Sequence, residues 1–191
     1  MARILIVYGT SYGQTQKIAG RIGDRARFRG HQVTLLNAQG IRGPLTLDDC
    51  EAVVVGGSVL YGRYQRALER FVSSHRAKLD RLPGTAFFSV SMAAARSTPA
   101  AAAEVTKTLD RFFLRTGWHP RAVTSFAGAL VYTRYGPILK RVLRFISKRQ
   151  GGDTDMSRDH EYTDWAAVDA WADAVLPGPV GRIAAAAPLP A

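Results

Sequence analysis

A short segment near the start of the chain has hydroxyl and glycine residues in an order that could bind an anion. Residues 8–15 read YGTSYGQT and include Thr10, Gly13 and Thr15. In a loop that precedes a helix, hydroxyls and backbone N–H groups can converge on one phosphate, and the helix dipole adds positive charge there. The same residue types also make ordinary tight turns. Taken alone, the loop therefore leaves a phosphate site and a simple turn both open.

The residues on either side of this loop predict the strand and the helix that a phosphate site needs. Residues 4–7 are apolar throughout, as in a parallel strand that is buried on both faces. After the loop, Ile18, Ala19, Ile22 and Ala26 recur at helical spacing. The local order is therefore strand, loop and helix.

The rest of the chain alternates predicted strands and helices. Further strands are expected over residues 31–36, 52–57, 85–90 and 123–130, and helices are expected up to about residue 29, over 67–79, from Pro99, and from Thr163 or Asp164. Gly128, inside the last strand, indicates a bulge or a close backbone approach. Alternating elements form parallel sheets with helices on both faces. We expect an α/β fold with a doubly wound, five-stranded parallel sheet in the order 2-1-3-4-5.

In a sheet of this order, a ligand binds beyond the carboxyl ends of the strands, between the first and third strands. Three loops meet there, at residues 10–15, 58–64 and 91–96. The residues expected to bind a cofactor are Thr10, Ser11, Tyr12, Gly13, Gln14, Thr15, Ser58, Val59, Leu60, Tyr61, Gly62, Ser91, Met92 and Ala93.

The first loop resembles the phosphate loop of flavodoxins, which carries a Ser/Thr, any residue, Thr/Ser, Gly, any residue, Thr pattern. Thr10, Gly13 and Thr15 match it, whereas Tyr12 stands where a small hydroxyl residue is usual. The resemblance implies a flavodoxin-like fold that binds the monophosphate of FMN. It also implies that Tyr61 stacks on the flavin ring, although a tyrosine on a surface loop is the alternative. Neither the triphosphate-loop nor the dinucleotide-loop pattern is present.

Composition limits the class of protein. The chain has 191 residues, enough for one domain, and a formal net charge of +11. Such a charge implies an anionic partner, whether nucleic acid, an acidic membrane surface or an acidic small molecule. Because flavodoxins that shuttle electrons are acidic as a family, a simple carrier of that kind is not expected. Cys50 is the only cysteine, which fits a reducing cytoplasm, and neither a signal peptide nor a membrane span is expected.

A long connection separates the fifth predicted strand from the last helix. No acidic residue occurs from Thr133 to Gln150, and apolar and basic residues alternate there at helical spacing. A basic amphipathic helix is typical of a membrane-surface element or of a lid over an anionic substrate. It could equally pack against its own domain. The residues expected to face substrate or membrane are Arg134, Lys140, Arg141, Arg144 and Lys148.

Several separate segments are similar to the bacterial menaquinone-dependent protoporphyrinogen dehydrogenases: residues 58–64, 128–135, 151–155 and 162–165. The resemblance covers about residues 3–176. It implies FMN as cofactor, oxidation of protoporphyrinogen IX, and electron transfer to menaquinone or ubiquinone by a cytoplasmic protein associated peripherally with the inner membrane. We expect a domain over residues 1–176, an insertion over 133–160 and a disordered tail over 177–191.

Two other functions remain open at this stage. One is a general FMN-dependent quinone reductase or electron-transfer protein. The other is a basic binder without enzymatic activity, but no motif for nucleic acid is recognisable, so no nucleic-acid partner is expected. The chemistry would take place on the flavin, because the four histidines are dispersed and predict neither a catalytic triad nor a metal site. The sequence leaves a homo-oligomer open.

Overall fold

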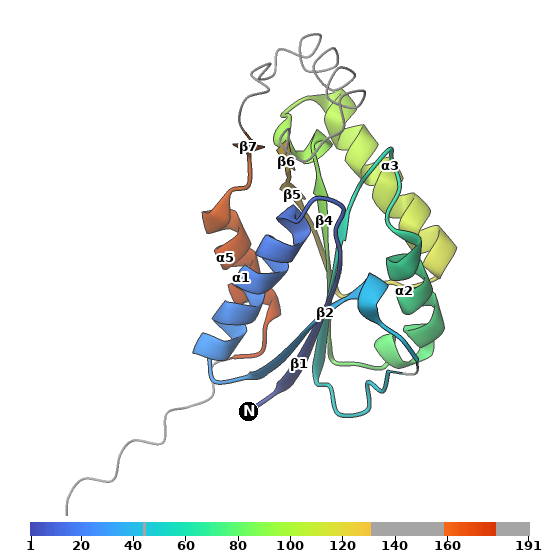
Figure 1. The fold of residues 1–191 in the computed structure, drawn as a ribbon, viewed down its shortest axis with the longest axis vertical. Coiled ribbons are helices and arrows are strands. Elements are labelled where there is room, and N and C mark those ends of the chain that lie inside the picture. Colours follow the sequence, from blue (N-terminus) through green and yellow to red (C-terminus); the bar gives the residue numbers. More distant parts are fainter. Residues whose placement is uncertain (44, 131–158, 179–191) are drawn as a thin grey trace, which may run out of the picture.

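Five parallel strands form the centre of the molecule in the order β2-β1-β3-β4-β5 (Figure 1). This computed structural model describes residues 1–43, 45–130 and 159–178. The order confirms the flavodoxin-like sheet expected from the alternating pattern. The strands are β1 (Arg3–Gly9), β2 (Gln32–Asn37), β3 (Ala52–Ser58), β4 (Gly84–Ser91) and β5 (Ala122–Ala127).

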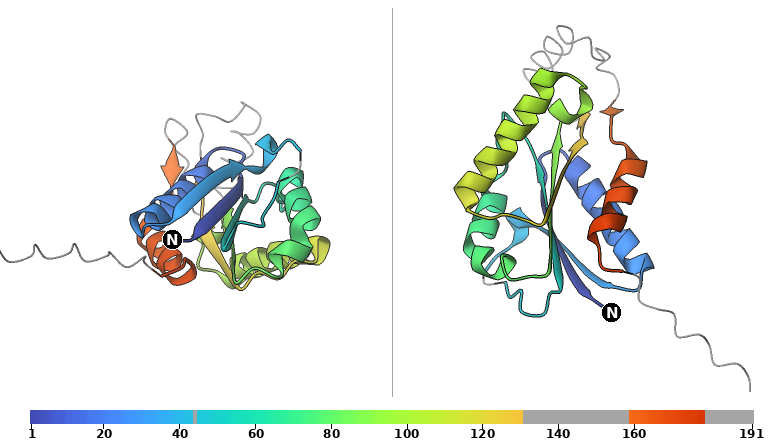
Figure 2. Two further views of the ribbon diagram at one scale, coloured as in Figure 1. Left: turned by 90° about the horizontal axis from the view of Figure 1, so that it is seen from below. Right: turned by 180° about the vertical axis from the view of Figure 1, so that it is seen from behind.

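Helices cover both faces of the sheet. Helices α1 (Gln14–Phe28) and α5 (Trp165–Val175) lie on one face, and α2 (Arg66–Leu79) and α3 (Pro99–Thr116) lie on the other (Figures 1 and 2). Two buried clusters result, because successive strand residues point to opposite faces. Ile4 and Ile6 of β1 pack in the cluster under α1 and α5, whereas Leu5 and Val7 pack in the cluster under α2 and α3.

Side chains at the helix ends explain where two helices begin. Thr98 caps α3 by accepting a hydrogen bond from the backbone N–H of Ala101 at 3.2 Å, and Pro99 follows as the first helical residue. Asp164 caps α5 by accepting a hydrogen bond from the N–H of Ala167 at 3.0 Å. Both starting points confirm the sequence-based boundaries.

The single strand predicted over residues 123–130 is wrong. Strand β5 ends at Ala127, and residues Ala129–Leu130 form a separate strand, β6, which pairs antiparallel with β7 (His160–Glu161). Gly128 causes the break, because its N–H donates to the Ser91 carbonyl oxygen at 3.1 Å and its own carbonyl accepts from the Tyr162 N–H at 3.1 Å. The chain thus leaves the sheet beside the predicted ligand site.

Some expectations lie outside the described residues. They are the substrate- or membrane-facing residues Arg134, Lys140, Arg141, Arg144 and Lys148, all but the end of the insertion, and the tail from residue 179. Over residues 1–43, 45–130 and 159–178, no helix is long and apolar enough to cross a membrane. In the same ranges, no group of three or more His, Cys, Asp or Glu side chains could hold a metal ion.

Candidate functional site

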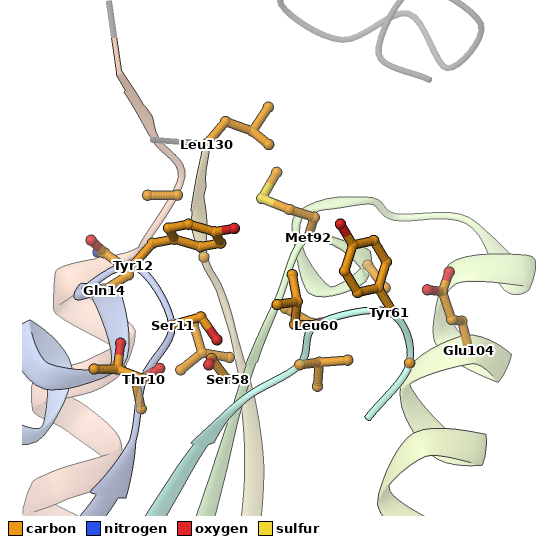
Figure 3. A pocket seen from close by; sticks show the side chains of 18 of the residues that line it. Thr10, Ser11, Tyr12, Gln14, Ser58, Leu60, Tyr61, Met92, Glu104 and Leu130 are labelled. Carbon is orange, nitrogen blue, oxygen red and sulfur yellow. The ribbon is translucent and has the colours of Figure 1, made fainter. Parts of the chain in front are cut away.

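A cavity of about 340 Å³ opens beyond the carboxyl ends of the central strands (Figure 3). The structure brings all three predicted loops to its walls, and every predicted cofactor residue except Gly13 lines it. The lining is mostly apolar, with polar residues on the first loop and also at Ser58, Ser91, Arg96 and Glu104. A pocket with this size and lining is typical of small-molecule and cofactor sites.

The first loop leads into α1 and leaves the start of that helix without a side-chain cap. Gly13 is the residue before the helix and has φ of 101°, in the left-handed region that favours glycine. Thr10 Oγ1 accepts a hydrogen bond from the Gly13 N–H at 2.9 Å, which fixes the loop. No side chain caps α1, so the N–H groups of its first turn can bind a ligand.

Two buried hydroxyls at this end of the cavity support an anion site. Thr15 is fully buried, and its Oγ1 has no hydrogen-bond partner among the described residues; the same holds for the buried Oγ of Ser58. Leaving a buried polar group unsatisfied costs about 1–3 kcal/mol. An acceptor such as a phosphate oxygen would satisfy the Thr15 hydroxyl. The residues present therefore fit the phosphate of a flavin mononucleotide.

The second loop is a tight hairpin turn that carries Tyr61. Leu60 and Arg63 exchange backbone hydrogen bonds of 2.9 and 3.1 Å, while Tyr61 and Gly62 between them have φ of 51° and 69°. Two successive positive φ values are typical of a type I′ turn. Tyr61 is 77% exposed and lines the cavity, and Arg111 of α3 donates a hydrogen bond to the Gly62 carbonyl at 3.2 Å.

A second tyrosine on this loop has a different role. Tyr64 is buried, and its hydroxyl donates to Ser89 Oγ at 2.8 Å. Burial raises the pKa of the Tyr64 phenol far above its usual range, although the hydrogen bond with Ser89 opposes the shift. Tyr64 therefore belongs to the core beneath the cavity and supports the loop that presents Tyr61.

Hydrogen bonds shape the third loop and join the start of α1 to the end of β5. Ser91 Oγ accepts a hydrogen bond from the Ala94 N–H at 3.2 Å, which shapes the short turn after β4. On the other side, Gln14 donates to Thr163 Oγ1 at 2.8 Å, and Thr163 donates to the Ala127 carbonyl at 2.8 Å. Thr163, just before α5, thus connects the start of α1 to the end of β5.

Several lining residues are absent from the sequence-based prediction: Val90, Arg96, Glu104, Gly128, Ala129 and Leu130. Residues 128–130 follow β5, which lies next to β4. The strand order therefore predicts that they lie beside the third loop, which follows β4. Arg96 is the last residue of the predicted third loop. Glu104 lies inside α3, and nothing in the local sequence marks it.

Two histidines, His31 and His75, have structural partners. His31 is buried, accepts a hydrogen bond from the Ala2 N–H at 3.2 Å and contacts the Pro177 carbonyl at 3.2 Å. His75 Nε2 lies 3.0 Å from the Leu45 carbonyl. Among the described residues, no histidine lines the cavity.

Comparisons with known proteins agree with this geometry. A family model described as a flavodoxin domain matches residues 5–157. The chain is 32% identical over 166 residues to the protoporphyrinogen IX dehydrogenase [quinone] of Escherichia coli (strain K12), which covers 87% of this chain and 90% of that protein. It is 35% identical over 182 residues to the protein of the same name from Leishmania major. That match covers 92% of this chain and 76% of the Leishmania major protein.

A solved archaeal flavodoxin is also similar, with 19% identity over 64% of this chain and 82% of that chain and a TM-score of 0.43. The site combines an uncapped helix start with a tyrosine at the cavity and mostly apolar walls. The chain belongs to the flavodoxin-like protoporphyrinogen IX dehydrogenase [quinone] family and is a flavin-dependent oxidoreductase.

Proposed function

We propose that this protein uses FMN to oxidise protoporphyrinogen IX to protoporphyrin IX and passes the electrons to menaquinone or ubiquinone. The observation that carries the proposal is the buried Thr15 hydroxyl, which has no hydrogen-bond partner among the described residues. It lies beside the uncapped start of α1, in the same cavity as Tyr61. One phosphate site next to an aromatic surface suits a mononucleotide. The names of the Escherichia coli and Leishmania major relatives supply the reaction.

The protein's part in this reaction is to bind and orient. Thr15 and the first N–H groups of α1 hold the phosphate, and Tyr61, Leu60 and Met92 flank the ring. FMN held by these residues would supply the group that takes hydride from the tetrapyrrole and passes the electrons to the quinone. No side chain is assigned as a proton donor or acceptor.

The basic insertion supports a peripheral position on the inner membrane. A quinone resides in the bilayer, and Lys140, Arg141, Arg144 and Lys148 would be attracted to anionic lipid. Each basic residue near such a surface contributes about 1 kcal/mol to binding. Replacing these four residues with glutamate should abolish sedimentation with anionic vesicles and leave flavin content unchanged. Unchanged sedimentation would instead assign the insertion to substrate binding or to packing.

A direct test is an absorption spectrum of the purified protein followed by an activity assay. We expect one FMN per chain and formation of fluorescent protoporphyrin when protoporphyrinogen IX and a quinone are supplied together. Reduction of quinones by a nicotinamide donor, with no activity on protoporphyrinogen, would replace the proposal with a general quinone reductase. A colourless protein that binds no FMN on reconstitution would reject the cofactor.

A further inference from the structure

Arg96 and Glu104 are the two charged residues among the described residues that line the cavity. Figure 3 shows Glu104 projecting from α3 on the side of Tyr61 that is remote from Thr10 and Tyr12 of the phosphate loop. The cavity thus has an anion site at one end and an isolated ion pair at the other. The FMN phosphate accounts for the first of these features and leaves the second unexplained.

The ion pair leaves one edge of the Arg96 guanidinium incompletely used. Arg96 Nη2 donates to Glu104 Oε2 at 2.9 Å, with 32% of the Arg96 side chain and 57% of the Glu104 side chain exposed. Arg96 Nε is buried and has no hydrogen-bond partner among the described residues. A buried donor without an acceptor is unfavourable, so this group favours a ligand that can reach it.

A carboxylate is the ligand that this edge recognises best. Nε and Nη2 of arginine lie side by side and can donate two parallel hydrogen bonds to the two oxygens of one carboxylate. Glu104 uses Nη2 without satisfying Nε. The isoalloxazine ring of a flavin carries no carboxylate, whereas protoporphyrinogen carries two propionates. The unused donor is therefore better matched to the substrate than to the cofactor.

We propose that Arg96 binds a propionate carboxylate of the tetrapyrrole through Nε and Nη2, and that Glu104 competes for the same guanidinium. This inference rests on the proposed function and specifies the substrate contact within it. Glu104 holds the guanidinium in place when no substrate is bound, and its negative charge weakens binding of the incoming carboxylate. The two residues therefore have opposite effects on substrate affinity.

Because Arg96 and Glu104 are expected to have opposite effects on substrate affinity, variants at the two positions distinguish this proposal from an ion pair with a purely structural role. The FMN-loaded Arg96→Met and Glu104→Gln variants are titrated with protoporphyrin IX and with its dimethyl ester in detergent, and quenching of flavin fluorescence is measured. Arg96→Met should weaken binding of the free acid about ten- to hundred-fold, the range for a charged hydrogen bond, without weakening binding of the ester. Glu104→Gln should tighten binding of the free acid and leave the ester unchanged.

Matched controls lie on the same helix as Glu104. Lys107→Met and Asp110→Asn make the same changes in charge at exposed positions that do not line the cavity. Both should bind the free acid and the ester like the wild type. Flavin content, measured for every variant, should not change, because Arg96 is assigned to the substrate.

Three results would overturn the inference. They are equal losses of free-acid and ester binding in Arg96→Met, loss of flavin from that variant, or weaker free-acid binding in Glu104→Gln. Failure of the proposed function can be distinguished from failure of this inference, because the titration measures binding and does not require turnover. Intact discrimination between acid and ester without oxidation of protoporphyrinogen would reject the reaction and retain Arg96 as a carboxylate-binding residue.

Discussion

Arg21 of α1 and Asp169 of α5 form a two-pronged ion pair, with hydrogen bonds of 2.7 and 2.6 Å between guanidinium and carboxylate, although 148 positions separate them in sequence. Planar pairs of this kind combine charge with fixed geometry. The contact joins the helix that begins at the phosphate loop to the helix that follows the insertion. Helix α5 is thereby held beside α1 (Figure 2).

The same pattern continues along both helices. Arg25 pairs with Asp173, Arg29 also contacts Asp173 at 2.7 Å, and Lys17 pairs with Glu161 of β7 at 2.9 Å. The basic residues recur every four positions, so they share one face of α1. Together these pairs form a ladder that runs from the end of the helices toward the cavity.

The ladder should make stability depend on pH in the acidic range. Hydrogen bonds from Arg21 and Arg25, with the nearby positive charge, lower the pKa values of Asp169 and Asp173. A lowered pKa in the folded state stabilises the protein above the unfolded value, about 3.9 for aspartate, and this contribution is lost as pH falls through the folded pKa. Asp169→Asn/Asp173→Asn should therefore lower the urea midpoint at pH 7, and the difference from wild type should shrink as pH falls below about 3.9.

The control for this experiment is Asp24→Asn, which removes an exposed carboxylate on α1 whose ion pair, with Arg27, lies within the same helix. Its urea midpoint should differ little from wild type, because exposed pairs three residues apart contribute little. An effect of the double variant that is the same at pH 3 and pH 7 would contradict the assignment to charged carboxylates.

Replacing Thr15 with valine should separate cofactor binding from stability. The hydroxyl is buried and unpartnered among the described residues, so its removal costs no hydrogen bond in the unliganded protein. Valine keeps the shape but cannot donate to a phosphate, and FMN affinity should fall about ten- to hundred-fold. Isothermal calorimetry on the apoprotein measures the affinity, and thermal melting of that apoprotein should show no loss.

Thr116→Val provides the matched comparison. Thr116 is also buried, but its hydroxyl donates to the Phe112 carbonyl at 2.9 Å, far from the cavity lining. This variant should lose about 1 kcal/mol of stability and retain FMN affinity. If Thr15→Val bound FMN like the wild type, the phosphate site would have to be placed elsewhere.

Replacing Tyr61 with glycine should stabilise the apoprotein and weaken FMN binding. Tyr61 has φ of 51°, which strains a residue with a side chain, and it is the one such non-glycine residue over the described ranges. Glycine adopts this conformation freely, so the apoprotein should gain up to about 1 kcal/mol. FMN binding should weaken about five-fold through loss of stacking, which is worth roughly 1 kcal/mol. A destabilised apoprotein would contradict the turn assignment.

Packing at Gly56 should be intolerant of even a methyl group. A Cβ at this position of β3 would lie 2.0 Å from Cζ of Phe88, which is fully buried on β4. Gly56→Ala should cost about 1–3 kcal/mol or prevent folding. Gly20→Ala, in α1 with no atom within 4 Å of the added carbon, should instead stabilise by up to about 1 kcal/mol. Circular dichroism melts of both variants test the contrast.

The sequence by itself determined the sheet order and the three loops that line the cavity, because both follow from local patterns. The apolar residues of β1, the helical spacing after Gly13 and the alternation of elements are readable along the chain, and the edge of a parallel sheet brings the three loops together. The helix starts at Pro99 and Asp164 were readable because capping involves residues close in sequence.

Only the tertiary structure decided which distant residues share that site. The strand predicted through Gly128 breaks because its backbone bonds to Ser91 and Tyr162, and neither partner is nearby in sequence. The same holds for the contact between Arg96 and Glu104, which depends on how α3 packs beside the third loop. Long-range contacts of this kind depend on the packing of the whole domain, whereas strand and helix patterns depend on neighbours along the chain.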